Sequence, residues 1–306
     1  RAVAVEPGDA TVPRGGAIQI TGTLQNFSAD FAELVFRTSD AAEWVRLPMA
    51  RDSASGTFTA RVFDLVEQTT YFVESDGIRS GEFTLRISDM PAVAQVALDL
   101  VYPAYTRDEP ETIEDGGDVA AVVGTRVTVR PTITKPIRGG TLRFDDGTEI
   151  PLAQRDDGTW AATFTVRADG FYRIDLESTD RREVVGGIQY AIEALEDRGP
   201  TVSISDPGRD TRATAVEELL IDVTARDEYG LAQVALHYRV NGGEEKTVVL
   251  SQGSGNSTEM RAAHTLFLEE LGLKPGDLVA YHASAKDGSG NVTQSDVYFV
   301  DIRPFG

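Results

Sequence analysis

The chain has 306 residues, of which 41% are hydrophobic and 25% are charged, and this composition excludes wholesale disorder. Its formal net charge of -20 disfavours binding to nucleic acid or to anionic membrane surfaces, because a negative surface repels phosphate groups. There are no cysteines, so disulfide frameworks, thiolate zinc sites and cysteine nucleophiles are excluded.

The first predicted domain covers residues 1–90. Ala17–Thr23 and Phe31–Arg37 alternate between apolar and polar residues, which predicts β-strands. Leu65 precedes Tyr71 by six residues, a spacing typical of the tyrosine corner of β-sandwiches, in which the Tyr hydroxyl bonds to the connecting backbone. Asp89-Met90-Pro91 is the predicted joint, because proline ends strand pairing.

The second predicted domain covers residues 91–196 and repeats features of the first. Gly158-Thr159-Trp160-Ala161-Ala162 matches Gly56-Thr57-Phe58-Thr59-Ala60 in residue type and position, which indicates an internal repeat. The acidic stretch Asp108–Asp118 is predicted to be a solvated loop, with capture of a cation or a basic partner as the alternative. Glu196–Pro200 is the second predicted joint.

The third predicted domain covers residues 197–306 and ends in a long hairpin, Leu273–Val300. Ser251–Ser257 is rich in Ser and Gly, which predicts a flexible loop, and His264–Leu271 is predicted to be a helical turn. Alternation places four hairpin residues on one face: Val279, Tyr281, Ala283 and Ala285.

Part of the third domain resembles bacterial immunoglobulin-like domains. The resemblance rests on Pro200-Thr201-Val202-Ser203-Ile204, on the alternating strand Ile221–Asp227, and on the Asn-Gly hairpin Val240–Gly243. Together with the repeat, it predicts an all-β chain of three tandem immunoglobulin-like β-sandwich domains in an elongated arrangement.

The whole chain also resembles the ectodomain segment of an uncharacterised bacterial membrane-anchored envelope family. Tyr102–Thr106, Pro207–Arg212 and Leu268–Gly272 carry this second resemblance. It implies an extracytoplasmic location, in the periplasm or at the cell surface, and a membrane anchor outside these 306 residues. The family has no activity that could be transferred to this chain.

The joint between the second and third domains is the predicted metal site. In an immunoglobulin-like sandwich the B–C and F–G loops lie at one end, which here faces the linker. Carboxylates, an amide and backbone carbonyls are the oxygen ligands that Ca²⁺ accepts. The alternative is ordinary turn chemistry, with Arg198 and Arg226 neutralising the acidic side chains. The predicted calcium ligands are Glu196, Asp197, Asp227, Glu228, Asp287 and Asn291.

The first joint is expected to hold no calcium. Its corresponding loops carry Lys135, Arg138, Arg181 and Arg182 around Asp89. In the third domain, His237 and His282 are predicted to form an exposed cross-strand pair, for which the sequence shows no third zinc or nickel ligand.

No catalytic motif occurs in the sequence, neither a nucleophile elbow, a phosphate-binding glycine loop nor a zinc-protease helix. We therefore expect no enzyme and no cofactor other than calcium. The favoured function is a spacer and interaction region of a bacterial envelope protein, with other envelope or surface proteins as partners. The alternatives are a module that binds glycan or protein through third-domain loops, and the accessory region of an enzyme.

The prominent aromatics are predicted to be core residues rather than a sugar platform: Trp44, Tyr71, Trp160, Tyr172 and Tyr281.

Overall fold

The computed structural model describes residues 1–38, 40, 42–180 and 184–306. Within them the chain is all-β, as predicted, and its helical elements are two short 3-10 helices, η1 (Ala104–Thr106) and η2 (Leu268–Leu271). In this part of the chain no helix is long and apolar enough to span a membrane. Arg181 and Arg182 lie outside the described residues.

The chain divides into two compact units. The first unit contains residues 1–101 and 110–195, and the second unit contains residues 102–109 and 196–306. The division into three domains at residues 90 and 196 stays a prediction.

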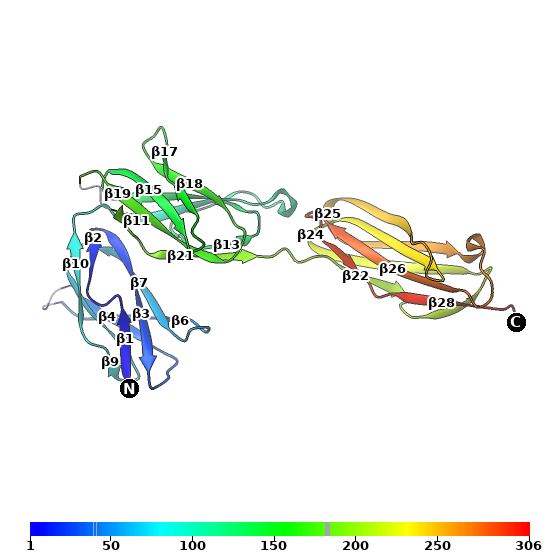
Figure 1. The fold of residues 1–306 in the computed structure, drawn as a ribbon, viewed down its shortest axis with the longest axis horizontal. Coiled ribbons are helices and arrows are strands. Elements are labelled where there is room, and N and C mark those ends of the chain that lie inside the picture. The colour runs from blue at the N-terminus through cyan, green and yellow to red at the C-terminus, as the bar shows by residue number, and fades with distance from the viewer. Residues whose placement is uncertain (39, 41, 181–183) are drawn as a thin grey trace. The chain divides into compact units, whose positions relative to one another are not determined.

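Residues 2–88 form the first sandwich, which has two sheets (Figure 1). One sheet has the strand order β1-β3-β7-β6, and the other has the order β2-β10-β8-β4-β5, with β9 paired to β8. The strands are β1 (Ala2–Glu6), β2 (Ala10–Pro13), β3 (Gly16–Gln25), β4 (Glu33–Arg37), β5 (Val45–Pro48), β6 (Ala50–Arg51), β7 (Phe58–Leu65), β8 (Thr69–Ser75), β9 (Ile78–Arg79) and β10 (Phe83–Ser88).

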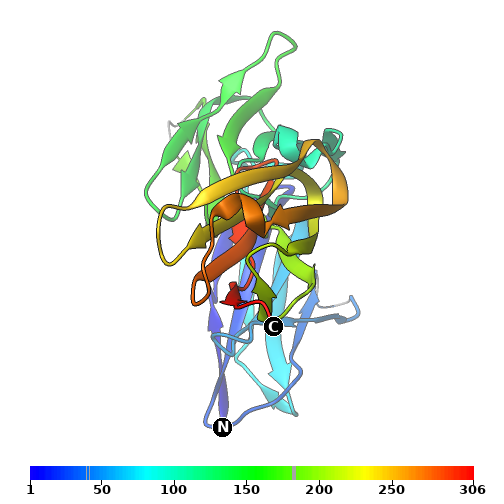
Figure 2. The same cartoon turned by 90° about the vertical axis from the view of Figure 1, so that its right-hand side faces the viewer.

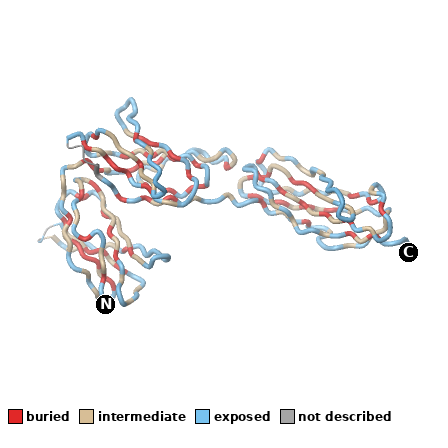
Figure 3. The backbone as a smooth tube through the Cα atoms, in the orientation of Figure 1, coloured by how far each residue is buried: buried red, intermediate tan, exposed pale blue. Residues whose placement is uncertain are grey.

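The core of this sandwich lies between its two sheets. Ile20 of β3 and Phe58 of β7 pack in one buried cluster with Leu34 of β4 and Val73 of β8. These side chains leave water because alternate strand residues face inward, and their burial is the main favourable term in folding. Figure 3 shows the result as buried and exposed residues that alternate along the strands.

Residues 93–195 form the second sandwich on the same plan. Its sheets have the orders β12-β11-β14-β18-β17 and β13-β21-β19-β15-β16, with β20 paired to β19. The ring of Phe164 links the two sheets, because it contacts Phe144 and Tyr172 at centroid distances of 5.2 and 5.6 Å. The strands are β11 (Val93–Val101), β12 (Glu111–Ile113), β13 (Val119–Val122), β14 (Arg126–Ile133), β15 (Ile137–Phe144), β16 (Glu149–Pro151), β17 (Ala153–Gln154), β18 (Trp160–Thr165), β19 (Gly170–Ser178), β20 (Val184–Val185) and β21 (Gln189–Leu195).

Residues 201–303 form the third sandwich. Its strands join in one continuous sheet with the order β22-β24-β26-β28-β23, to which β25 is added through β24 and β27 through β26. Val279, Tyr281, Ala283 and Ala285 of β26 are all buried, as their alternation predicted. The strands are β22 (Thr201–Asp206), β23 (Thr211–Thr214), β24 (Glu218–Val240), β25 (Lys246–Phe267), β26 (Leu278–Asp287), β27 (Val292–Gln294) and β28 (Tyr298–Arg303).

The long hairpin of β24 and β25 contributes to both layers of the third sandwich. Residues 218–226 of β24 pair with β22 on one side, whereas residues 231–240 pair with β26. Ile221 from the first part and Leu236 from the second lie in one buried cluster, so the hairpin is folded over at residues 227–230. In Figure 2 its yellow-to-orange ribbon curves around one side of this unit.

Two sequence predictions were wrong in this hairpin. Residues 251–257 belong to β25 rather than to a flexible loop, because they pair with residues 231–234 of β24. The predicted helical turn is present only at η2, since β25 continues to Phe267.

The strand order is that of an immunoglobulin-like sandwich. In the first sandwich the opening strand is split into β1, which joins one sheet, and β2, which pairs in parallel with the last strand of the other sheet. In the second sandwich β11 joins one sheet and β13 pairs in parallel with the last strand of the other, with η1 and β12 between them in the chain. The third sandwich has the same parallel pair, β23 with β28. The immunoglobulin-like prediction therefore holds.

The predicted tyrosine corner has a different partner. The Tyr71 hydroxyl donates to the carbonyl of Gly8 at 2.7 Å, and Tyr172 donates to Gly117 at 2.5 Å. Gly8 lies between β1 and β2 and Gly117 lies between β12 and β13, so both lie outside the strands where the chain crosses from one sheet to the other. Tyr281 is the corresponding residue of β26, and its buried hydroxyl has no hydrogen-bond partner.

Candidate cation site

Three aspartates from separate parts of the second unit come together beside the segment that leads into β22. Asp197 lies between β21 and β22, Asp227 lies at the bend of β24, and Asp287 is the last residue of β26. Each offers a carboxylate oxygen, and these oxygens all lie within 4.8 Å of one another. Asp227 and Asp287 are 7% and 2% exposed, so this acidic cluster is largely removed from water.

The bend that positions Asp227 depends on two glycines. Gly230 has φ +122° and Gly255 has φ +78°, and a Cβ on Gly230 would lie 1.8 Å from the Gly255 carbonyl oxygen. Only glycine tolerates this approach of the two strands. Asp227 then closes the bend, because its Oδ2 accepts hydrogen bonds of 2.9 Å from the N–H groups of both Tyr229 and Gly230.

The turn after β26 holds Asp287 in place. Its Oδ1 accepts hydrogen bonds from the backbone N–H groups of Ser289 and Asn291, at 3.0 and 2.8 Å. The Asn291 amide donates to Asp287 Oδ2 at 2.9 Å and to Asp197 Oδ2 at 3.1 Å. The Ser289 hydroxyl lies 2.6 Å from Asp197 Oδ2, so this turn also holds the segment before β22.

These hydrogen bonds leave two carboxylate oxygens without a donor. Asp197 Oδ1 and Asp227 Oδ1 are both buried and have no hydrogen-bond partner among the residues that the structure describes. Within the described residues no arginine or lysine forms an ion pair with any of the three aspartates, and Arg226 pairs instead with Glu259 at 3.5 Å. Of the alternative interpretation, the turn hydrogen bonds at Asp227 and Asp287 are present, whereas no ion pair joins Arg198 or Arg226 to these aspartates in the described part of the chain.

The crowding of like charges changes how the cluster titrates. Burial raises the pKa of Asp197 above its ordinary value, and the neighbouring charges of Asp287 and Asp227 raise it further. Burial would also raise the pKa of Asp287, but the hydrogen bonds from Asn291 and Ser289 outweigh it and place the pKa below its ordinary value. The cluster can therefore share a proton or hold a cation.

Four of the six predicted ligands are in this cluster, and two are not. Glu196 and Glu228 are exposed and do not belong to the group of carboxylate oxygens that meet. Ser289 was not singled out, although an Asp-x-Ser-x-Asn turn is a signal that could have found it. Tyr105 was missed altogether: its ring packs edge-on against Tyr229 at 5.8 Å, and Arg107 donates to the Ser254 carbonyl at 2.8 Å.

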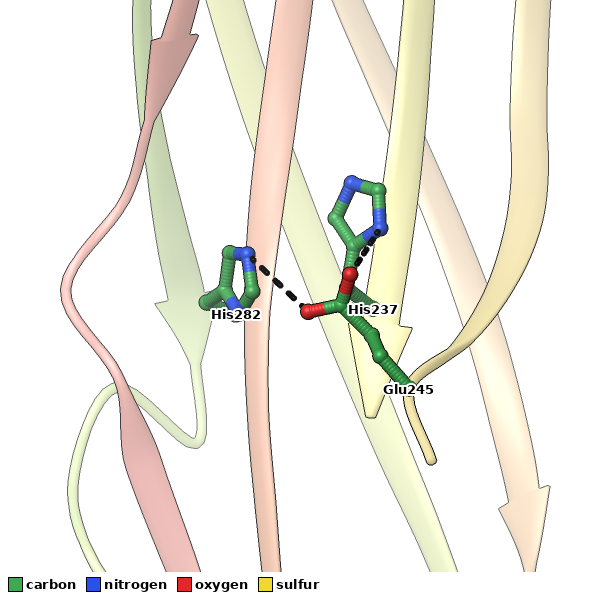
Figure 4. Close-up of side chains that lie close together, drawn as sticks. All are labelled: His237, Glu245 and His282. Carbon is green, nitrogen blue, oxygen red and sulfur yellow. Dashed lines mark ion pairs between the residues drawn. The ribbon is translucent and has the colours of Figure 1, made fainter. Parts of the chain in front are cut away.

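The histidine pair lies elsewhere in the third sandwich (Figure 4). His237 and His282 are register partners on β24 and β26, and the carboxylate of Glu245 lies 3.9 and 4.0 Å from their ring nitrogens. Glu245 is thus the third group that the sequence did not reveal. The side chains are 16% and 14% exposed, so the prediction of an exposed pair was wrong.

The arrangement of these rings does not suit a shared metal ion. They stack at a centroid distance of 4.9 Å with an interplanar angle of 21°, so their in-plane lone pairs run side by side instead of converging. Thr247 and Ser284 also hydrogen-bond the two nitrogens of His237, at 2.9 and 2.7 Å. Burial and the adjacent His237 lower the pKa of His282.

No protein-family model and no curated protein matches the chain. Similar solved structures include a 1.5-MDa bacterial ice-binding adhesin (11% identity, 98% of each chain, TM-score 0.32). They also include the fibronectin(III)-like modules of Clostridium thermocellum CbhA (17% identity, 60% of this chain and 90% of that chain, TM-score 0.26). A third is the titin I-band fragment I67-I69 (8% identity, 99% of each chain, TM-score 0.27). Such distant likenesses do not identify what this chain binds.

Proposed function

We propose that this chain is a non-enzymatic, extracytoplasmic region of a bacterial envelope protein, in which it serves as a spacer and as a surface for other envelope proteins. The observation that carries the proposal is the repetition of one construction. In each sandwich the last strand pairs in parallel with a short strand near the start of that sandwich (β2, β13 or β23), and an inward-facing tyrosine fills the core beside it.

Such modules present sheet faces, strand edges and loops to their surroundings rather than a cleft between layers. Their interiors are filled by side chains, as Leu34, Leu142 and Leu236 illustrate with exposures of 0%. Strand edges and loops are the surfaces through which sandwiches of this class dock to other proteins. The net charge of -20 favours cations or basic partners and keeps the region soluble.

The alternative interpretation of the prominent aromatics as a sugar platform gains no support from their positions. Tyr71, Tyr172 and Tyr281 are buried core residues, as predicted. Trp44 packs edge-on against Phe72 at 5.1 Å and lies under the Arg37 guanidinium, so it too is part of the packed structure.

Replacement of the region within the full-length protein tests the proposal. Three unrelated immunoglobulin-like sandwiches of equal length would keep its function if it serves only as a spacer. If the native surface recognises partners, the replacement abolishes function, and cross-linking in intact cells captures envelope proteins only with the native sequence. Loss of a measurable enzymatic turnover on replacement would overturn the non-enzymatic assignment.

The proposed location is tested by reporter fusions. A periplasmic alkaline phosphatase fused after residue 306 should be active in cells, whereas a cytoplasmic reporter fused at the same point should not. The reverse result would place the region in the cytoplasm and end the envelope interpretation.

A further inference from the structure

The buried carboxylates of the described residues are treated in two different ways. Asp175, Asp227 and Asp287 are the buried acidic side chains, with exposures of 5%, 7% and 2%. Asp175 lies 2.5 Å from an Arg143 nitrogen and 3.1 Å from an Arg173 nitrogen. The other two aspartates have no such partner and face Asp197 as well. Arginine side chains therefore compensate the charge of Asp175, whereas no cationic side chain among the described residues compensates the charges of Asp227 and Asp287.

The lack of a positively charged partner leaves two carboxylate oxygens without a hydrogen bond. Asp197 Oδ1 and Asp227 Oδ1 have no hydrogen-bond donor although both are buried. A buried carboxylate oxygen without a partner is strongly unfavourable, and native proteins pair such charges or use them to coordinate metals. These two oxygens are also the atoms left open after the turns around Asp227 and Asp287 have satisfied their other oxygens.

The donor atoms select the class of cation. The cluster offers only oxygen: three carboxylates, the Ser289 hydroxyl and the Asn291 amide. Oxygen-only sites suit hard cations, and Ca²⁺ accepts six to eight oxygens at about 2.3–2.6 Å, so that two oxygens on opposite sides of the ion lie about 5 Å apart. Mg²⁺ needs a tighter octahedron with distances of about 2.1 Å. Oxygens that all lie within 4.8 Å of one another fit around a single ion, and three protein carboxylates at one ion are typical of calcium, because Mg²⁺ usually keeps several waters and takes only one or two carboxylates.

We propose that Asp197, Asp227 and Asp287 bind one Ca²⁺ ion at the start of the second unit. Asp197 Oδ1 and Asp227 Oδ1 are the first two ligands, and Asp287 supplies the third carboxylate. Asn291 completes the protein ligands by turning its amide, so that the carbonyl oxygen replaces the NH₂ group that now faces Asp197 and Asp287. Water fills the remaining positions, as is usual for calcium.

The ion joins segments that are far apart in the chain. Asp197 belongs to the segment before β22, Asp227 to the bend of β24, and Asp287 and Asn291 to the end of β26 and the turn that follows it. Tyr229 follows Asp227 and packs against Tyr105, so the segment of residues 102–109 is held beside the same bend. Calcium therefore stabilises the end of the second unit at which both segments attach.

Calcium titration of the whole chain is the first test. After removal of metal with EGTA, calcium should raise the melting temperature of the second unit by about 5–10 °C at saturation, with a Kd on the order of 1 mM or tighter. Potassium chloride at the same ionic strength controls for screening of the net charge of -20. Both tryptophans, Trp44 and Trp160, lie in the first unit, so their fluorescence should not change with calcium.

Direct binding is measured with calcium in a calorimeter and with terbium as a luminescent substitute. Tyr229 adjoins the site and Tyr105 lies against it, so excitation of tyrosine should sensitise terbium emission, which calcium then quenches by displacement. Asp227→Asn should weaken calcium binding roughly tenfold or more. Glu228→Gln is the matched control, since it removes the same charge from the adjacent, exposed position and should leave binding unchanged.

The change in melting temperature caused by Asp227→Asn distinguishes a residue that binds a metal ion from one that only closes a turn. In EGTA the variant should melt above the wild type, because one of three crowded charges is gone while the Asn oxygen still closes the bend. In calcium the order should reverse. A wild type that shows no calcium-dependent shift up to about 10 mM, a shift with the same calcium midpoint in Asp227→Asn as in the wild type, or an equal response to magnesium would overturn the proposal. None of these outcomes bears on the spacer function, which the replacement experiment tests by itself.

Discussion

The second and third sandwiches handle buried polar groups differently. In the second, Asp175 meets two guanidiniums and the Tyr172 hydroxyl meets the Gly117 carbonyl. In the third, Asp227 Oδ1 and the hydroxyl of Tyr281 are buried without partners. The fold is the same, so the difference lies in which side chains surround each group. The second sandwich satisfies its buried acidic group with its own side chains, whereas the third leaves acidic oxygens open to the proposed cation.

We expect the largest loss of stability when the ion pairs of Asp175 in the second sandwich are broken. Arg143→Met leaves Asp175 with only Arg173, and the free energy of unfolding of the first unit should fall by about 2 kcal/mol, because a buried carboxylate loses one charged hydrogen bond but keeps the other. Glu149→Gln is the control, because it removes only the exposed partner of Arg143 and should cost less than about 1 kcal/mol. Urea unfolding followed by tryptophan fluorescence measures both, and equal losses would show that the Asp175 pair contributes nothing special.

The same Tyr→Phe substitution in each sandwich compares tyrosine hydroxyls that have a hydrogen-bond partner with one that has none. Tyr71→Phe and Tyr172→Phe should each destabilise the first unit by about 1–2 kcal/mol, because a buried glycine carbonyl loses its donor. Tyr281→Phe should be neutral or stabilising for the second unit, since its hydroxyl has no partner to lose. Calorimetric melting curves resolve the two units. A destabilising Tyr281→Phe would mean that this hydroxyl is satisfied in solution.

Arg61 tests a partly exposed pair in the first unit. It lies 2.7 Å from Asp118, donates to the Gln189 carbonyl at 2.8 Å and stacks over the Tyr190 ring, so it links the first two sandwiches. Arg61→Met should cost about 1 kcal/mol after allowance for solvent screening. The unfolding transition of the first sandwich, reported by Trp44, should then no longer coincide with that of the second, reported by Trp160. Coincident transitions in the variant would show that the sandwiches are coupled by other contacts.

The smallest effect is a difference in pH dependence without calcium. Asp197 has a raised pKa, so its proton binds more tightly to the folded second unit than to the unfolded chain, whereas the lowered pKa of His282 has the opposite effect below about pH 6.5. In a His282→Gln background, which removes the opposing effect, the second unit should therefore gain stability as the pH falls from 7 toward the ordinary Asp value of 3.8. Asp118 and Asp99 of the first unit have pKa values lowered mainly by Arg61 and Arg130, so that unit should lose stability only as the pH falls below about 4. Parallel slopes of the two melting temperatures above pH 4 would contradict this contrast.

Much of the fold could be predicted because strands carry a local signal. Alternation at Val279–Ala285 and the repeat around Gly56 and Gly158 depend on neighbours in sequence, and they led to sandwiches with the correct buried faces. Residues 251–257 were misread because Ser and Gly are typical of loops. Their strand conformation comes from pairing with residues 231–234 across a bend that needs Gly230 and Gly255.

By itself, the sequence determined the all-β class, the repeated module and which loops carry acidic side chains, since each depends on composition or on short-range periodicity. Only the tertiary structure decided which of those side chains meet. Asp197 and Asp287 are distant in sequence, and Glu196 and Glu228 stand directly beside two of the ligands yet face solvent. Side-chain direction at a turn depends on the bend of the backbone and on the hydrogen bonds that close it, and neither is encoded in spacing alone.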